Sequence, residues 1–179
     1  MSKDTEEGRY LYIVDYEEDA ERKRAEYLFN NWEKGSIDRP SGLVRIAEGV
    51  KRDELYERLV GKVPEDQVDI HRLQPVDTDV EPDSITVEQR IDASVDAVET
   101  FLDYILSKKK AVLQSAARNE YEVYTKKGRA EVSYTLSEAD DQIIVQVNIN
   151  GYPPAPSFLA EFFETELIDY ATSQSSNQQ

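Results

Sequence analysis

Apolar and polar side chains alternate along two neighbouring segments of the carboxy-terminal half, and this alternation limits the possible folds more than any other feature of the chain. The apolar members are Val132, Tyr134 and Leu136 in the first segment and Ile143, Val145, Val147 and Ile149 in the second. Successive side chains of a β-strand point to opposite faces, so each segment predicts a strand with one buried face. Such a sheet needs helices or a second sheet to cover its apolar face.

Helices are expected on both sides of these strands in the sequence. Ser94 precedes apolar residues at helical spacing, which we expect to continue as a helix to about Ala116. A second apolar helix follows the proline-rich corner at residues 151–156, and further strands are expected at residues 85–91 and 121–124. Residues 84–171 are therefore predicted as a β-α-β-β-β-α unit, an antiparallel sheet with helices on one face.

Strand and helix signals also alternate in the amino-terminal half, at residues 9–74. Segments rich in β-branched and aromatic residues predict strands at residues 9–16, 43–47 and 68–73. Helices are expected from a capping box at Asp15 and Glu18 to about Lys34, and again at residues 51–60. The predicted order is β-α-β-α-β. We therefore expect an α+β protein in which this unit packs with the carboxy-terminal one.

The remaining segments are expected to be a connector and two tails. The connector is acidic and bracketed by prolines, at residues 75–83. The polar ends, residues 1–8 and 172–179, are expected to be disordered. The chain has no cysteine, no apolar leader and no long apolar stretch, so we expect no disulfide, no contact with a membrane and a cytoplasmic location.

The charge of the chain is strongly negative. Aspartate and glutamate number 37 against 21 lysines and arginines, which gives a formal net charge of −16. Because an acidic surface stays hydrated at high ionic strength, we interpret this composition as halophilic adaptation. Two other interpretations are consistent with it: an ordinary acidic protein, and a nucleic-acid mimic whose carboxylates imitate phosphates.

No catalytic constellation can be identified in the sequence, so we do not predict an enzyme. The single histidine, His71, has no partner at metal-ligand or acid–base spacing. Phosphate-binding glycine loops and nucleophile motifs are missing from the sequence. Five acidic residues of the connector region match a calcium-loop register, but Pro82 stands where such a loop needs glycine. We expect no metal site and no cofactor.

One stretch of the chain is basic. Seven lysines and arginines and two glutamates lie between Lys108 and Arg129. Cations beside a tyrosine can contact the phosphates and bases of a nucleic acid, so we expect RNA or DNA to bind here. The candidate binding residues are Lys110, Arg118, Tyr124, Lys126, Lys127 and Arg129. The alternative is structural, because lysines also complement the end of a helix and pair with carboxylates of their own chain.

Two family resemblances bear on function. The segment ITVEQRIDASVDAV, from Ile85 to Val98, resembles the first strand and helix of START-like helix-grip ligand-binding domains, although those domains place more strands between their two helices. That resemblance implies an apolar ligand held between the sheet and Phe158, Phe162 or Phe163 of the last helix. The helix-flanked strands also have the element order of double-stranded-RNA-binding domains, but Pro156 and Ser157 stand where those domains carry lysines.

The sequence therefore leads to three functional hypotheses. The first is a non-catalytic binding or regulatory protein of a salt-adapted cell, which contacts RNA or DNA through the basic hairpin. The second is a reduced helix-grip module for a small apolar ligand. The third is a structural subunit, whose amino-terminal half contacts a protein partner or a second copy of the chain.

Overall fold

The computed structural model describes residues 8–176. The chain divides into two compact units, Met1–Arg72 and Leu73–Gln179. The boundary lies just before the acidic segment at residues 75–83. No helix in the described part of the chain is long and apolar enough to cross a membrane.

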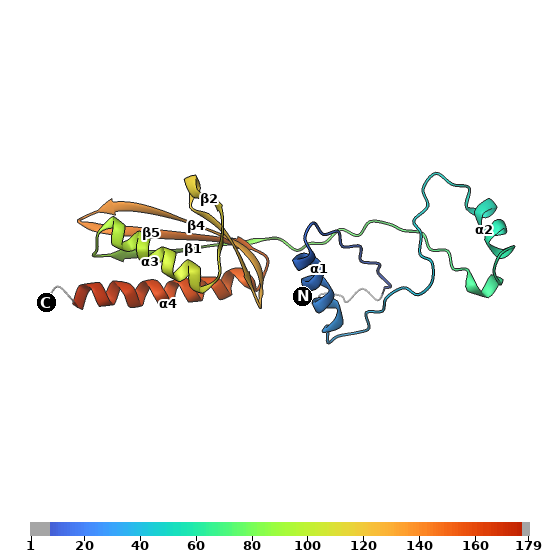
Figure 1. The fold of residues 1–179 in the computed structure, drawn as a ribbon, viewed down its shortest axis with the longest axis horizontal. Helices are drawn as coiled ribbons and strands as arrows, with labels where there is room; N and C mark the ends of the chain where they lie inside the picture. The colour runs from blue at the N-terminus through green and yellow to red at the C-terminus, as the bar shows by residue number, and fades with distance from the viewer. Residues whose placement is uncertain (1–7, 177–179) are drawn as a thin grey trace. The chain divides into compact units, whose positions relative to one another are not determined.

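The carboxy-terminal unit is built on one antiparallel sheet (Figure 1). Its strands are β1 (Asp83–Ile91), β2 (Val112–Ser115), β3 (Glu120–Thr125), β4 (Gly128–Ala139) and β5 (Gln142–Gly151). Their order across the sheet is β1-β5-β4-β3-β2. The sheet and its helices confirm the predicted α+β class.

The alternation read from the sequence fixes which face of this sheet is buried. Val132 on β4 pairs with Ile149 on β5, and Tyr134 pairs with Val147. All four side chains are buried, whereas the residues between them on β4 and β5 are not. The expected one-sided sheet is thus confirmed.

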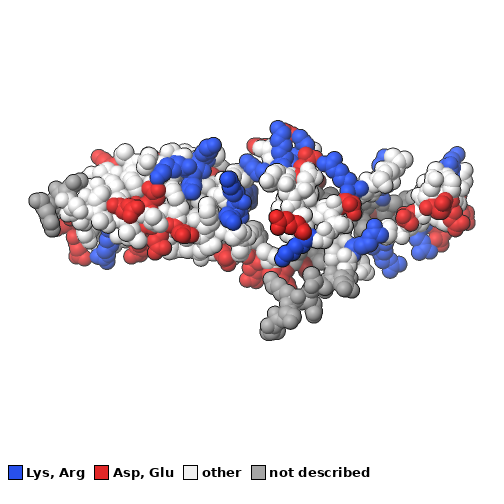
Figure 2. Space-filling view, turned by 90° about the horizontal axis from the view of Figure 1, so that it is seen from below, with Lys and Arg blue, Asp and Glu red and all other residues white. Residues whose placement is uncertain are grey.

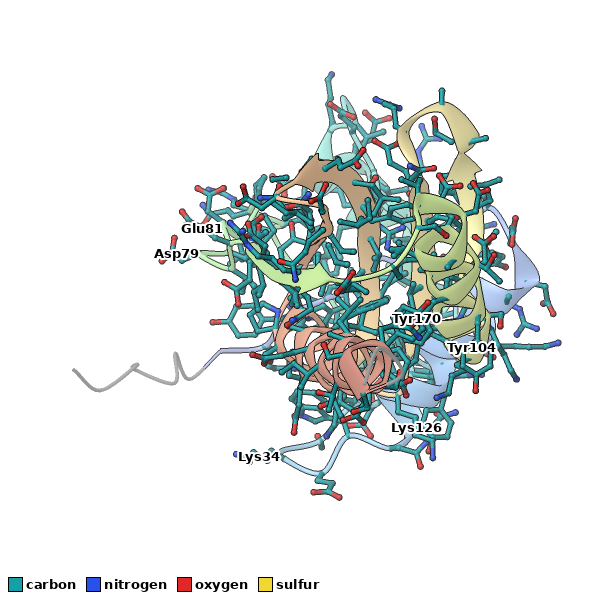
Figure 3. The ribbon with its side chains drawn as sticks, turned by 90° about the vertical axis from the view of Figure 1, so that its left-hand side faces the viewer. Lys34, Asp79, Glu81, Tyr104, Lys126 and Tyr170 are labelled. Carbon is teal, nitrogen blue, oxygen red and sulfur yellow. The ribbon has the colours of Figure 1, made fainter. Side chains whose placement is uncertain are left out.

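Two helices cover the buried face, α3 (Val95–Lys108) and α4 (Ala155–Ser176). They lie side by side in Figure 1, and the rings of Phe101 on α3 and Tyr170 on α4 stack with their centroids 4.0 Å apart. Figure 3 shows Tyr170 between the two helices. Ser94 caps α3 as expected, because its hydroxyl accepts a hydrogen bond from the backbone N–H of Ala97.

The end of α3 differs from the prediction. The helix stops at Lys108, and Val112, expected within it, begins β2. Lys110 adopts a left-handed conformation with φ of 53°. The N–H groups of Lys110 and Ala111 donate to the carbonyls of Ser107 and Leu106. This is a Schellman termination, which turns the chain away from the helix axis and releases the next residues for a strand.

The end of α4 also differs from the prediction. The helix continues through Ser176, so residues 172–176 are helical rather than a disordered tail. The rest of that expected tail, residues 177–179, lies outside the described residues, as do residues 1–7 of the expected amino-terminal tail. Ser and Thr hydroxyls in the last turns donate to backbone carbonyls one turn earlier, which lets polar residues occupy a helix without competing for its N–H groups.

The amino-terminal unit lacks the sheet that we predicted for it. The described residues before β1 form α1 (Asp19–Asn30), α2 (Arg52–Val60) and the short 3-10 helix η1 (Glu65–Gln67), and they contain no strand. The expected strands at residues 9–16, 43–47 and 68–73 are therefore wrong. Strand propensity alone does not make a strand, because each one needs a partner for its backbone groups and a covered apolar face.

The burial of the amino-terminal residues agrees with this. No residue from 8 to 82 is buried, and many apolar side chains there are largely exposed, such as Leu43 at 88% and Tyr12 at 70%. Helix α1 begins one turn later than expected, with a capping box between Glu18 and Glu21. The carboxy-terminal unit alone supplies a packed core.

Candidate functional site

The basic residues singled out in the sequence surround the β3–β4 hairpin. Its turn is fixed by Thr125, whose side-chain oxygen accepts a hydrogen bond from the N–H of Lys127 at 3.0 Å and donates to the carbonyl of Gly128 at 2.9 Å. Gly128 has φ of +129°, a conformation that side chains disfavour. This turn leaves the side chains of Lys126 and Lys127 exposed at the tip.

Arg129 and Tyr124 form the second cross-strand pair below this tip, after Thr125 and Gly128. The guanidinium of Arg129 lies 3.0 Å from the Glu122 carboxylate, its neighbour on β3. A hydrogen bond with Tyr124, followed by the attraction of Glu122, raises the pKa of Arg129, which stays charged at any physiological pH. Tyr124 and Glu122 thus hold the Arg129 side chain against the sheet, and Arg129 remains exposed to solvent.

Lys110 reaches the same region from the other side of β3. Val112, the first residue of β2, pairs with Glu122 near the end of β3, so Lys110, two residues before β2, lies toward the end of the sheet at which β3 finishes. Its left-handed conformation at the end of α3 brings the chain to the sheet edge at this point. We call the group formed by Lys110, Tyr124, Lys126, Lys127 and Arg129 the basic end of the sheet.

Arg118 does not belong to the basic end. It lies in the 3-10 helix η2 (Ala116–Arg118), before the first residue of β3, whereas the hairpin follows the last residue of that strand. Six strand residues separate the two positions by about 20 Å. Arg118 is also paired with Glu120 at 3.1 Å. The structure therefore brings five of the six candidate residues together and leaves this one apart.

Two lysines of the same basic stretch contact their own chain. Lys108 is 2.6 Å from the Glu166 carboxylate of α4, and this contact raises its pKa. The ammonium of Lys109 lies 4.1 Å from the centroid of the Phe162 ring and 5.1 Å from that of Phe158. Both lysines hold α3 and α4 together, as the structural alternative predicts for part of the basic stretch.

Lys110, Lys126 and Lys127 differ from those two lysines. Among the residues that the structure describes, none of the three has a carboxylate within 4.0 Å or an aromatic ring beneath its ammonium. Figure 2 shows most of the lysine and arginine side chains on the visible face of the carboxy-terminal unit in one group, with acidic side chains scattered over the rest of that face. The basic end is therefore a local positive region on an acidic protein.

The sheet face away from the helices is polar and adjoins the basic end. It carries Glu122 and Glu131, which lie opposite each other on β3 and β4. Thr86 donates to Asn148 at 2.8 Å, and Gln146 donates to Glu88 at 2.8 Å, so side chains on this face bond across strands. Among the described residues, no group of three or more histidine, aspartate or glutamate side chains could hold a metal ion.

Tyr152 is a further aromatic residue beside the basic end that the sequence analysis did not select. Ala130 pairs with Gly151, so Tyr152, directly after β5, lies at the same end of the sheet as Arg129. It is 56% exposed. The sequence shows Tyr152 directly after an alternating strand. Its proximity to Arg129 could not be predicted, because it depends on the pairing of β4 with β5.

The phenylalanines proposed to hold an apolar ligand have other partners. Phe163 is fully buried in the core, and Phe162 packs edge-on against it with centroids 5.3 Å apart. Phe158 and Phe162 lie under the Lys109 ammonium. These contacts use the rings for packing between the helices.

No family model matches this chain, and no curated protein matches it.

Proposed function

We propose that this chain is a non-catalytic binding protein whose basic end contacts the phosphates of a nucleic acid. The observation that supports the proposal most is a set of three lysines that have no ionic partner among residues 8–176. Lys110, Lys126 and Lys127 are exposed at one end of the sheet, in a chain with a net charge of −16. Carboxylates are abundant in this protein, so cations left without one are available to an external anion.

The local geometry supports the same proposal. Tyr124 offers an aromatic side chain in the middle of the cationic group, and Arg129 beside it can bind a phosphate with two parallel hydrogen bonds. Phosphate contacts of this kind position a nucleic acid without reading its sequence. The proposal is therefore for binding with little sequence preference.

Salt concentration affects this binding strongly. At about 1 M salt the Debye length is about 3 Å, so attraction over long distances is lost and only direct contacts remain. A protein of a salt-adapted cell would depend on those contacts. Each phosphate neutralised by a cation adds about 0.7 to the slope of log affinity against log salt for single strands. The three free lysines and Arg129 predict a slope between about −2 and −3.

The test is a fluorescence-anisotropy titration with labelled RNA and DNA, single- and double-stranded, at about 0.2 M and about 2 M potassium chloride. The variant K126E/K127E should lose most of the binding and flatten the salt slope. The matched control is K51E/K62E, which makes the same charge change at two exposed lysines of the amino-terminal unit. Equal losses in the two variants would reduce the effect to net charge and contradict the proposal.

A second candidate function is supported by the amino-terminal unit. Its large apolar side chains are exposed, among them Tyr12, Ile13 and Trp32 at 70%, 62% and 55%. Exposed apolar residues at this density are typical of segments that bind another protein surface. Light scattering at several protein concentrations tests the version in which the partner is a second copy of the chain. The variant Y12S/I13S should then lower the average mass, and a monomer at every concentration would exclude self-association.

A further inference from the structure

Tyr124 of the basic end and Tyr152 beside it lie at the same end of the sheet as the cations. Pairing places Tyr124 opposite Arg129, while Lys110 lies two residues before β2 and Tyr152 directly after β5. We call this set of four residues the row; it follows the ends of β2, β3, β4 and β5 and holds two cations and two rings. Neighbouring strands are about 4.8 Å apart, so the row spans about 14 Å, enough for a few nucleotides.

Tyrosine rings beside cations favour unpaired bases. A base of single-stranded nucleic acid can stack on an exposed ring while its phosphate contacts the adjacent cation. In a duplex, both faces of each base are covered by its neighbours, and only the phosphates remain accessible to these cations. Rings between the cations thus add affinity for single strands and nothing for duplexes.

Carboxylates on the same face restrict the path of the strand. Glu122 and Glu131 occupy the next row of the sheet, and Glu120 lies beyond them on β3. Of these three carboxylates, only Glu122 is paired with a cation of the row, because Arg129 lies 3.0 Å from it. A phosphate backbone running along the sheet would meet these acidic side chains, whereas one crossing the end of the sheet avoids them. On β3 and β4 the charge pattern therefore favours the path across the end, and Asp83 of β1, paired with Gly151, limits this path on the β1 side.

We infer that the basic end binds single-stranded nucleic acid in preference to duplex, across the end of the sheet, with bases stacked on Tyr124 and Tyr152. This inference rests on the proposed function and specifies its ligand. Phosphates of the strand contact Arg129 and Lys110, and the next phosphates contact Lys126 and Lys127 at the hairpin tip.

The test compares Tyr152→Ala with Tyr152→Phe in the full chain. Tyr152 is 56% exposed, so neither change should affect folding, which a thermal melt verifies. The probes are a labelled oligothymidylate of about 12 nucleotides and a duplex of equal length. Y152A should weaken binding of the single strand by about 5- to 150-fold and leave binding of the duplex unchanged, because one stacked base is lost. Y152F keeps the ring and should bind as the original chain does.

A second variant tests the path of the strand. Glu131→Gln removes a carboxylate next to the row and should strengthen single-strand binding, while Glu88→Gln, farther along the same face, should leave it unchanged. Failure of the inference and failure of the proposed function give different results. In the first case, K126E/K127E abolishes binding while Y152A weakens binding of the single strand and the duplex equally, or weakens neither. The stacking inference is then wrong and the proposed phosphate contact stands. If the original chain binds no nucleic acid at either salt concentration, both are wrong.

Discussion

Phe158 and Phe163 lie five residues apart on α4, and they differ in burial. Phe163 is fully buried between the helix and the sheet, whereas Phe158 remains 38% exposed beneath the ammonium of Lys109. Five residues correspond to well over one turn, so the two rings face different sides of the helix. The same residue type thus serves the core at one position and the surface at the other.

This difference predicts the cost of removing each ring. Phe163→Ala should lower the free energy of unfolding by about 3–5 kcal/mol, because it leaves a cavity in a closely packed core. Phe158→Ala removes the same atoms from a half-exposed position and should cost well under half as much. Urea unfolding followed by far-ultraviolet circular dichroism measures both. Similar costs for the two variants would contradict the described packing of α4.

Much of the carboxy-terminal unit could be predicted because its signals are periodic and local. The alternation around Val145 and the cap at Ser94 each specify an element without knowledge of the rest of the fold. Strand β2 was missed because Val112 continues the helical spacing of α3, and a left-handed lysine at position 110 carries no signal comparable to a glycine. The end of a helix in such a case depends on where its tertiary partners lie.

The amino-terminal prediction failed for a different reason. Residues 9–16 have the composition of a buried strand, but composition does not supply the neighbouring strand that would complete its hydrogen bonds. The candidate site was also only partly predictable. Lys126, Lys127 and Arg129 are close in sequence, but the exclusion of Arg118 and the approach of Lys110 depend on strand register.

The buried tyrosine Tyr134 predicts a loss of stability in alkali. Burial, and then the nearby Tyr121 and Asp103, raises the pKa of Tyr134 from 10.0 to about 12. Below pH 10 its phenol is neutral in the folded and unfolded chains alike. Between pH 10 and pH 12 the unfolded chain loses this proton and the folded chain keeps it, so stability falls as the pH rises. At about pH 11.5 the loss should be on the order of 2 kcal/mol.

The variant Tyr134→Phe isolates this effect. It has no phenol to ionise, so its free energy of unfolding should fall less between about pH 9 and about pH 11.5 than that of the original chain. Tyr16→Phe is the control, because it removes the same hydroxyl group from a residue that is 54% exposed. Urea unfolding at the two pH values gives the comparison. An identical fall in Y134F and the original chain would show that Tyr134 ionises normally.

Gly151 is required by the close approach of β4 and β5. A Cβ atom at this position would lie 2.9 Å from the carbonyl oxygen of Arg129 and 3.1 Å from the Cβ of Ala130. The first of these is a backbone atom of β4, which is paired with a strand on each side, so it cannot move freely. Gly151→Ala should therefore lower the free energy of unfolding by about 1–3 kcal/mol. Gly61→Ala serves as the control, because its Cβ would meet only ordinary contacts at 3.5 Å and beyond.

The exposure of residues 8–82 predicts that this part of the amino-terminal unit contributes nothing to the stability of the sheet. None of residues 8–82 is buried, and α1 and α2 have 12 and 9 residues, lengths at which a helix without packing is marginal in water. A chain reduced to residues 73–179 should unfold within about 0.5 kcal/mol of the full chain, since exposed residues away from a core have small effects. Hydrogen exchange on the full chain provides an independent measurement: amides of β4 and β5 should be protected up to the global unfolding free energy, and those of α1 and α2 should exchange far faster.

A large loss of stability in the shortened chain, or strong protection in α1, would mean that the exposed apolar residues at positions such as 12 and 13 are covered by the chain itself. Stability unchanged by the truncation would instead leave those side chains available to a partner.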